Sequence, residues 1–290
     1  MAKKDRSTVK LIISFLISSV FSAGLVLASF QIIPGLVNID PQDEKFLQGV
    51  EKGIEYYIKN QEKKQMEEYQ KAQKEKEQAL NNIPKTDKPQ VELFVMSHCP
   101  YGLQMEKGII PAIETLGDKV NFQVKFCDYA MHGQKELDEQ TLQHCIMQTE
   151  GSKYLSYLKC FIQSGETDSC LAEVAISRDN LQNCIASTDS QYKINENYQN
   201  KTGEWKGEFP PFDIFKAENQ KYKIQGSPSL VINGQEVDSG RDSHNLLKTI
   251  CRGFQNPPAE CEASLDSNSP AAGFGGEATA NNAADASCGA

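Results

Sequence analysis

The distribution of apolar and polar residues divides the chain into segments of different character. Residues 11–33 form a mostly apolar run without charges, and residues 42–80 are rich in Glu, Lys and Gln. Apolar residues in the charged stretch recur at three- and four-residue steps, mainly over its first half. That spacing aligns side chains on one helix face, so residues 42–80 are predicted to form a helical stalk. Pro84 and Pro89 then indicate a linker over residues 81–89.

Residues 90–262 carry the patterns of a folded α/β domain. The apolar residues 91–96 predict a strand, residues 101–116 a helix, and the alternating residues 120–126 a second strand. A strand–helix–strand unit implies two parallel strands joined by a right-handed crossover. The domain is therefore predicted to begin with a βαβ unit.

The second part of this domain combines helices with a hairpin. Helical periodicity covers about residues 134–200, where glycines separate short helices. Asn233-Gly234 lies between two short strand-like stretches, and this dipeptide is the strongest two-residue hairpin signal. A helix over about residues 242–254 completes the pattern. The predicted order is βαβ, a helical insertion, then ββα.

The two ends of the chain differ from the domain. Residues 11–33 are long enough to cross about 30 Å of hydrocarbon as a helix rising about 1.5 Å per residue. Four Lys and Arg residues within residues 1–10 favour a cytoplasmic N-terminus, which places the rest of the chain outside. A cleaved signal peptide is the alternative, although Ala28-Ser29-Phe30 is a poor cleavage site, and both interpretations export the domain. Residues 263–290 contain almost no large apolar residue and are predicted to be a disordered tail.

The stalk allows two interpretations. A short coiled coil over its apolar first half would make the protein a homo-oligomer. A single helix that only separates the domain from the membrane agrees equally well with the polar second half. The sequence leaves both open.

Composition narrows the class of protein. The 290 residues carry a formal net charge of −9, which argues against a nucleic-acid partner because phosphate contacts need clustered Lys and Arg. Nine cysteines are many for a cytosolic protein, and none forms a CxxC pair of the zinc-ribbon type. Disulfides therefore fit better than metal, and they imply an oxidising compartment, with a bacterial periplasm or cell surface favoured over a eukaryotic lumen. No cofactor or metal is expected.

Cys99 is the candidate nucleophile. It follows the first predicted strand and precedes a helix, in the stretch Ser97-His98-Cys99-Pro100-Tyr101-Gly102. Pro100 suits the first helical turn, because its missing N–H could not have bonded within the helix. Cys99 is then at or near the N-cap, where unpaired N–H groups and the positive end of the helix dipole stabilise a thiolate. We expect an exposed, reactive thiol, assisted by His98 if that imidazole is protonated.

The order of elements, with Cys99-Pro100-Tyr101 at the first helix and Gly226-Ser227-Pro228 before the hairpin, resembles the thioredoxin superfamily. Within it, the chain is similar to the DsbA-like group with a helical insertion, and especially to relatives of the gamma-interferon-inducible lysosomal thiol reductase. In that family a His-Gly pair follows the second strand and a Cys comes thirteen residues after the His, as His132-Gly133 and Cys145 do here. The resemblance covers about residues 90–261.

The resemblance implies roles for several residues. Pro228 matches the superfamily's cis proline, which faces the nucleophile and, together with Ser227, presents backbone to an extended substrate. Pro100 and Tyr101 belong to the same substrate-binding surface. His132 is implied to be an accessory residue in redox chemistry or substrate binding, and otherwise only caps the connection from strand to helix.

The candidate redox centre departs from the family pattern. The family uses a CxxC pair, but Gly102 stands where the second Cys is expected, and residues 129–131 lack the Cys that precedes the His-Gly pair in the reductase. Either Cys99 works alone and an outside thiol resolves its mixed disulfide, or Cys127 resolves it. Cys127 ends the second strand, so both cysteines would emerge at one edge of two parallel strands about 5 Å apart. A Cys99–Cys127 disulfide is therefore geometrically reasonable.

Six other cysteines are predicted to form structural disulfides, as in the cysteine-rich insertion and late cysteine pair of that family. The four in the helical insertion allow three connectivities. The nested one is favoured because it ties the outer helices together and then the inner turn, and a third bond pins the segment after the last helix. Each closure is worth roughly 2–4 kcal/mol. The predicted bonds are Cys145–Cys184, Cys160–Cys170 and Cys251–Cys261, with Cys288 as the odd thiol.

Three functions compete at this point. The first is a membrane-anchored thiol–disulfide oxidoreductase or isomerase that acts on the thiols or disulfides of exported proteins and is served by an unidentified redox partner. The second is a redox-inactive thioredoxin-like module that binds peptides as a chaperone or scaffold. The third is a structural surface protein whose working parts are the stalk and tail.

Overall fold

The computed structural model describes residues 44–276 and divides the chain into two compact units at Tyr69, within helix α2 (Glu44–Asn81). In the first unit, the described side chains of α2 are exposed, among them Tyr56, Tyr57 and Met66. The predicted membrane anchor is outside the described residues. No helix within residues 44–276 is both long enough and apolar enough to cross a membrane.

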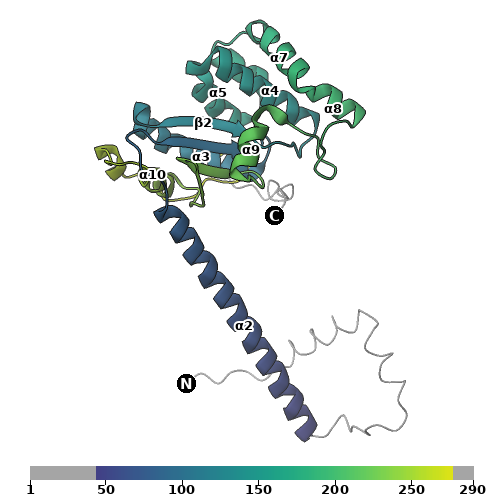
Figure 1. Ribbon diagram of the computed structural model, residues 1–290, viewed down its shortest axis with the longest axis vertical. Coiled ribbons are helices and arrows are strands. Elements are labelled where there is room, and N and C mark those ends of the chain that lie inside the picture. Colours follow the sequence, from purple (N-terminus) through teal and green to yellow (C-terminus); the bar gives the residue numbers. More distant parts are fainter. Residues whose placement is uncertain (1–43, 277–290) are drawn as a thin grey trace. The chain divides into compact units, whose positions relative to one another are not determined.

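The second unit is built on a four-stranded mixed sheet with the strand order β2-β1-β3-β4. Figure 1 labels the edge strand β2 and the helix α3 (Pro100–Leu116) beside the sheet. Its one parallel pair is β1 (Gln90–Val95) and the edge strand β2 (Asn121–Phe126), with Val95 opposite Phe126. Strand β3 (Ser229–Ile232) is antiparallel to β1 and forms a hairpin with β4 (Gln235–Val237). The turn between them contains Asn233 and Gly234, both with positive φ, which is the conformation that this dipeptide favours.

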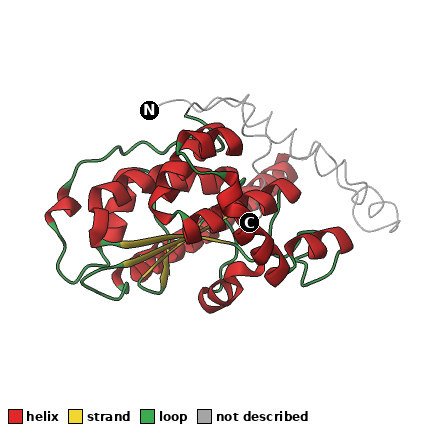
Figure 2. Cartoon of the chain, turned by 90° about the horizontal axis from the view of Figure 1, so that it is seen from above, coloured by secondary structure: helices red, strands yellow, loops and turns green. Residues whose placement is uncertain are grey.

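The side chains of β1 alternate between two packed faces. Val91, Leu93 and Val95 enter the larger core, whereas Phe94 belongs to a second, smaller cluster. Helix α3 packs against α10 (Ser243–Cys251), and apolar residues of both helices fill the larger core. α9 (Lys216–Tyr222) covers the other face, where Phe94 meets the edge of the Tyr222 ring. Helices thus shield both faces of the sheet, whose strands gather in one part of the domain (Figure 2).

Helix α9 was not predicted, and it forms over a buried ion pair. The Lys125 ammonium on β2 is 2.7 Å from a carboxylate oxygen of Glu92 on β1 and 3.1 Å from one of Glu218 on α9. The Glu92 and Lys125 side chains are almost fully buried, at 5% and 8% exposure. Burial lowers the pKa of Lys125, but hydrogen bonds to Glu92 and Glu218 outweigh it and raise that pKa. The ammonium therefore stays charged under the helix.

The helical insertion consists of five helices between β2 and α9: α4 (Gln134–Thr149), α5 (Gly151–Ser164), α6 (Thr167–Glu173), α7 (Arg178–Tyr192) and α8 (Ile194–Asn200). Cys145–Cys184 joins α4 to α7, and Cys160–Cys170 joins α5 to α6. Cys251–Cys261 ties the end of α10 to the short 3₁₀ helix Ala259–Glu262. These are the pairs of the predicted nested arrangement. Cys288 is outside the described residues.

Part of the predicted disordered tail is ordered. Residues 263–276 continue over the domain, and the backbone of Gly273 is buried. Leu265 and Phe274 pack against the larger core. The prediction of disorder is therefore wrong for this stretch, because two large apolar residues and backbone hydrogen bonds hold it down. Residues 277–290 are outside the described part of the chain.

Candidate active site

Cys99 lies at the N-cap of α3, with extended backbone angles (φ −69°, ψ 121°) and Pro100 as the first helical residue. Its N–H donates to Met96 O at 2.9 Å, which closes a tight turn after β1. Its own C=O accepts the N–H of Leu103 at 2.9 Å, the first bond of the helix. The sulfur therefore sits at the positive end of the helix dipole, as the position of Pro100 in the sequence predicts.

The expectation that this thiol is exposed is wrong. Cys99 has no exposed surface, and it belongs to a buried cluster with Phe94, Met96, Cys127 and Val231. The N-cap position alone does not determine exposure, because the cover comes from segments distant in sequence. A reagent or substrate can therefore reach this sulfur only after a local conformational change exposes it.

Ser227 lies against Cys99 and is joined to Pro228 by a cis peptide bond. Cys99 Sγ is 3.5 Å from the carbonyl oxygen of Ser227. The Ser227 hydroxyl oxygen accepts the N–H of Met96 at 2.9 Å, so this loop is fixed to the turn that holds Cys99. The sequence thus brings together two segments that lie 128 residues apart.

The same serine accounts for Gly102. A Cβ atom at position 102 would lie 2.7 Å from Ser227 Oγ, so the Ser227 side chain would have to shift, and 3.2 Å from Met96 O, which is a tight contact. The loop that contacts Cys99 therefore leaves little room for a side chain at position 102.

Cys127 lies directly after β2, and its N–H donates to Val95 O at 3.0 Å. The three disulfides of the described chain leave out both Cys99 and Cys127. Burial raises the pKa of the Cys127 thiol well above its ordinary value, and negative charge at Cys99, Asp128 and Glu136 adds to the effect. Cys127 is therefore a protonated thiol beside Cys99, in the same buried cluster.

Glu136, a residue that the sequence reasoning missed, links two loops of the site. One of its carboxylate oxygens accepts the N–H of His98 at 3.0 Å and the Nδ1 of the His132 ring at 2.9 Å. The other accepts the N–H of Met131 at 2.7 Å and that of His132 at 3.1 Å. This side chain is fully buried. The only feature of the sequence that pointed to Glu136 was that it is an acidic residue in the first turn of a helix.

The two charges of the His132–Glu136 pair stabilise each other. The hydrogen bond to Glu136 raises the pKa of His132 against the effect of burial, and the charges of Glu136 and Cys99 raise it further. Burial alone would raise the pKa of Glu136, but its bonds from His132 and from the His98 backbone hold it below the ordinary value. His132 can therefore be an imidazolium close enough to Cys99 to favour a thiolate there.

His98 does not supply such a charge. Burial lowers its pKa to about 4, in spite of the nearby Glu136 carboxylate. The ring packs edge-on against Phe161 and Phe274 and has its Nδ1 3.1 Å from the Ser97 hydroxyl. The hypothesis that a protonated His98 assists Cys99 at neutral pH is wrong, because its imidazole is neutral there.

Glu106 is a buried acid whose pKa responds to charge at Cys99. It lies on α3, two turns after Cys99, and is completely buried. One of its carboxyl oxygens has no hydrogen-bond partner within the described chain. Burial raises the pKa of Glu106 well above its ordinary value, and negative charge at Cys99 and Glu139 raises it further.

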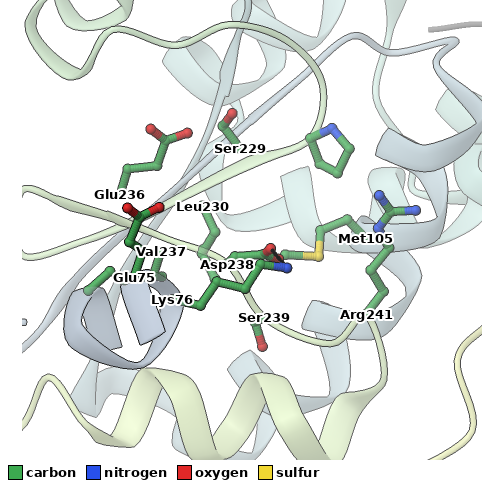
Figure 3. A pocket seen from close by; sticks show the side chains of 12 residues that line it. Glu75, Lys76, Met105, Ser229, Leu230, Glu236, Val237, Asp238, Ser239 and Arg241 are labelled. Carbon is green, nitrogen blue, oxygen red and sulfur yellow. Dashed lines mark ion pairs between the residues drawn. The ribbon is translucent and has the colours of Figure 1, made fainter. Parts of the chain in front are cut away.

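A pocket lies next to Pro228, the only one of the four predicted substrate-binding residues that lines it. A pocket of about 520 Å³ extends from Pro228 along α3 to the β3–β4 hairpin, with Met105 and Arg241 on one side and Glu236 on the other (Figure 3). The Arg241 guanidinium lies 4.8 Å from the centre of the Tyr101 ring and donates to Gln104 at 2.8 Å. Within residues 44–276, no three His, Cys, Asp or Glu side chains are grouped to hold a metal ion.

Comparison with known proteins finds proteins of similar structure but none of similar sequence. No protein-family model and no curated protein sequence matches the chain. Its structure is similar to the thiol-disulfide oxidoreductase MdbA of Actinomyces oris, at 14% identity and a TM-score of 0.40, over 59% of this chain and 83% of that one. It is also similar to reduced DsbA of Mycobacterium tuberculosis (11% identity, TM-score 0.43, 61% and 93% coverage) and to oxidised BdbD of Bacillus subtilis (14%, 0.41, 60% and 92%).

The domain has a thioredoxin-like fold. The sheet order β2-β1-β3-β4, its single parallel pair and the helix that starts at Cys99 give this topology directly. A helical insertion follows β2, as in the DsbA-like arrangement predicted above. The N-cap cysteine and the Ser227-Pro228 loop come together as this topology requires.

Proposed function

We propose that the chain is a thiol–disulfide oxidoreductase or isomerase in which Cys99 is the nucleophile. The contact between Cys99 Sγ at the helix N-terminus and the Ser227 carbonyl is the observation that carries this proposal. A substrate disulfide that enters along Ser227 and Pro228 would meet the sulfur in line with the helix dipole. Glu136 raises the pKa of His132, and the His132 imidazolium favours the thiolate.

The cellular location of this activity is inferred from the sequence. The apolar run at 11–33 would anchor the chain in a membrane with the domain outside, where exported proteins with thiols or disulfides are the substrates. Three structural disulfides agree with an oxidising compartment. The His132-Gly133 and Cys145 spacing supports a relation to the lysosomal thiol reductase family.

A second candidate function follows from the burial of both thiols. A thioredoxin-like module that binds peptides next to Pro228 without redox turnover would have no need of an accessible Cys99, and it tolerates Gly102 in place of a second cysteine. The two candidates differ in one observable: whether a disulfide substrate becomes covalently attached to Cys99.

The test is to map the covalent adduct. The reduced site, with structural disulfides intact, is incubated with a small excess of a peptide disulfide, quenched in acid and digested for mass spectrometry. We expect the peptide to be attached at Cys99 or, after resolution, to find a Cys99–Cys127 disulfide and released peptide thiol. An unmodified Cys99 after prolonged incubation would reject the exchange function in favour of peptide binding alone.

Replacement of Glu136 by glutamine should lower the pKa of His132, because the hydrogen bond that raises it loses its charge. His132 is protonated below its pKa, so over the pH range between the two values the variant lacks the imidazolium that the natural protein has. Because the variant also loses the negative charge of Glu136, the two effects on the Cys99 thiolate oppose each other, and the alkylation rate of Cys99 should change much less than the His132 titration. NMR titration of the His132 ring measures the shift directly.

Glu114→Gln is the matched control, since Glu114 is a half-exposed residue of α3 whose partner is Lys159. It changes the net charge equally and should leave both the His132 titration and the alkylation rate unchanged. An unaltered His132 pKa in Glu136→Gln contradicts the prediction.

A further inference from the structure

Residues 270–275, here called the strap, lie across the start of α3 and the end of α5. The N–H of Gly273 donates to the carbonyl of Pro100 at 2.9 Å, and that of Gly275 donates to the carbonyl of Ile162 at 3.1 Å. The Gln104 side chain donates to Pro270 O at 2.6 Å. The strap is therefore bound through its backbone to the residue that directly follows Cys99.

Lys107 is the main polar anchor of the strap. Its ammonium donates to the carbonyl oxygens of Ala271 at 2.5 Å, Gly273 at 2.8 Å and Gly275 at 2.7 Å. An ammonium has three donors, and all three are used on one short segment of backbone. Burial lowers the pKa of Lys107, and the carbonyls replace the water that this burial removes. Lysines on exposed helix faces rarely have such a complete set of partners.

Phe274 is the apolar anchor. Its ring is 5.3 Å from the centre of the Phe161 ring and 5.8 Å from that of His98, both edge-on, and it contacts Gly165 at the end of α5. Gly273 and Gly275 on either side of it have φ values of 78° and 81°. Only glycine adopts such angles readily, so the sequence Gly-Phe-Gly is suited to turn the aromatic side chain into this site.

The strap thus contacts both neighbours of the buried nucleophile: the ring of His98 on one side and the backbone of Pro100 on the other. Cys99 between them has no exposed surface. We propose that residues Pro100, Gln104, Lys107 and Phe161 form a peptide-binding site, that the strap occupies this site in cis, and that its departure frees the turn at His98 and Pro100 and so makes Cys99 accessible. The strap does not itself cover the sulfur, which is buried in a different cluster from that of Phe274, but it holds both neighbours of Cys99 in place.

The chemistry of the site defines what else it binds. The strap carries no charged side chain, and Lys107 contacts it only through hydrogen bonds to backbone carbonyls. A ligand in trans would therefore be an uncharged extended peptide with one aromatic residue between glycines. Such a peptide would compete with the strap, not with a substrate at the Pro228 pocket, which is lined by other residues.

The test measures the alkylation rate of Cys99 by iodoacetamide, mapped by mass spectrometry, in the full chain with its disulfides intact. Phe274→Ala removes the apolar anchor, and removal of residues 269–290 deletes the strap but keeps the turn in which Asn268 bonds to Asp266. Both variants should react about tenfold faster or more, in line with the loss of one partly buried aromatic side chain from the packed state. Lys107→Met should act in the same direction.

Removal of residues 277–290 alone is the matched control, because it shortens the chain and deletes Cys288 but leaves the strap in place. It should react at the natural rate. A synthetic peptide of residues 266–276, added to the chain that lacks residues 269–290, should slow alkylation again, and the same peptide with alanine at the Phe274 position should not.

The proposal is overturned if Phe274→Ala, folded by circular dichroism, is alkylated at the natural rate. It is also overturned if the strapless chain is no more reactive than the control truncation. Alkylation needs only a thiol at Cys99, so these outcomes leave the exchange function to be judged by adduct mapping.

Discussion

The Cys99→Ser variant is expected to reduce insulin disulfides no faster than the uncatalysed reaction. A serine hydroxyl cannot form or exchange a disulfide, and in the described chain no other sulfur occupies a helix N-terminus beside the Ser227-Pro228 loop. Cys127 does not replace it, because burial and neighbouring negative charge raise its pKa and keep it protonated. The variant should keep its three structural disulfides and its stability, since none of them involves Cys99.

The Cys127→Ser variant is expected to fail at a later step. Attack of the Cys99 thiolate on a substrate disulfide gives a mixed disulfide and one substrate thiolate. Cys127 would then give its proton to the substrate thiolate already released and attack Cys99 Sγ, which releases the second substrate thiolate, so that two electrons pass to the substrate and a Cys99–Cys127 disulfide remains. Without Cys127 the mixed disulfide should persist until an outside thiol removes it. Adduct at Cys99 should therefore accumulate in this variant and turn over in the natural protein.

Mass spectrometry of acid-quenched samples and the turbidity of reduced insulin measure the two steps. The double variant serves as the blank. Activity that survives in Cys99→Ser would remove Cys99 from the mechanism. Equal adduct levels with and without Cys127 would mean that Cys99 works as a monothiol, with an outside thiol as the resolving group.

Local patterns in the sequence were sufficient for most of this site. Pro100 fixes the start of α3 one residue after Cys99, and the alternation of residues 120–126 places Cys127 at the end of a parallel neighbour of β1. Both inferences need only backbone rules that act over a few residues. The loop at Ser227 required the family resemblance, because nothing local in the sequence shows which strand it will face.

The burial of Cys99 and the role of Glu136 could not be read in this way. Exposure depends on what other segments cover a residue, and Glu136 acts through three backbone N–H groups from two loops. In the sequence it is one acidic residue among several in a helix. Its importance appears only when the turn at His98 and the loop at Met131 are placed against the same carboxylate.

The strap was missed because composition was averaged over the whole tail. Residues 263–290 are mostly Ser, Ala, Gly and Asn, and this average predicts disorder. The informative feature was the isolated Phe274 between glycines, a residue with much apolar surface in a setting that can turn sharply. A single apolar residue orders a segment only if the folded domain offers a site for it. Here that site is formed by α3 and α5, which the sequence of the tail does not show.

The Lys125→Met variant is expected to lose about 3–5 kcal/mol of unfolding free energy, the usual cost of removing one partner from a buried ion pair. Methionine fills much of the same volume, so packing between Phe94 and Phe215, which the ammonium approaches at 5.9 and 5.5 Å, is largely kept. The loss comes from Glu92, a 5%-exposed carboxylate that would retain the Tyr222 hydroxyl at 2.9 Å but no cation. Urea unfolding with the disulfides intact measures the difference.

Two further variants separate this effect from a general loss of charge. Lys159→Met removes the cation of a half-exposed pair with Glu114 at 2.7 Å and should cost less than about 1 kcal/mol, because water already screens that pair. Glu92→Gln combined with Lys125→Met should recover a large part of the stability, since no charge is then left buried without a partner. If Lys125→Met is no more costly than Lys159→Met, the second face of the sheet is held by its aromatic rings, and α9 does not depend on the charge beneath it.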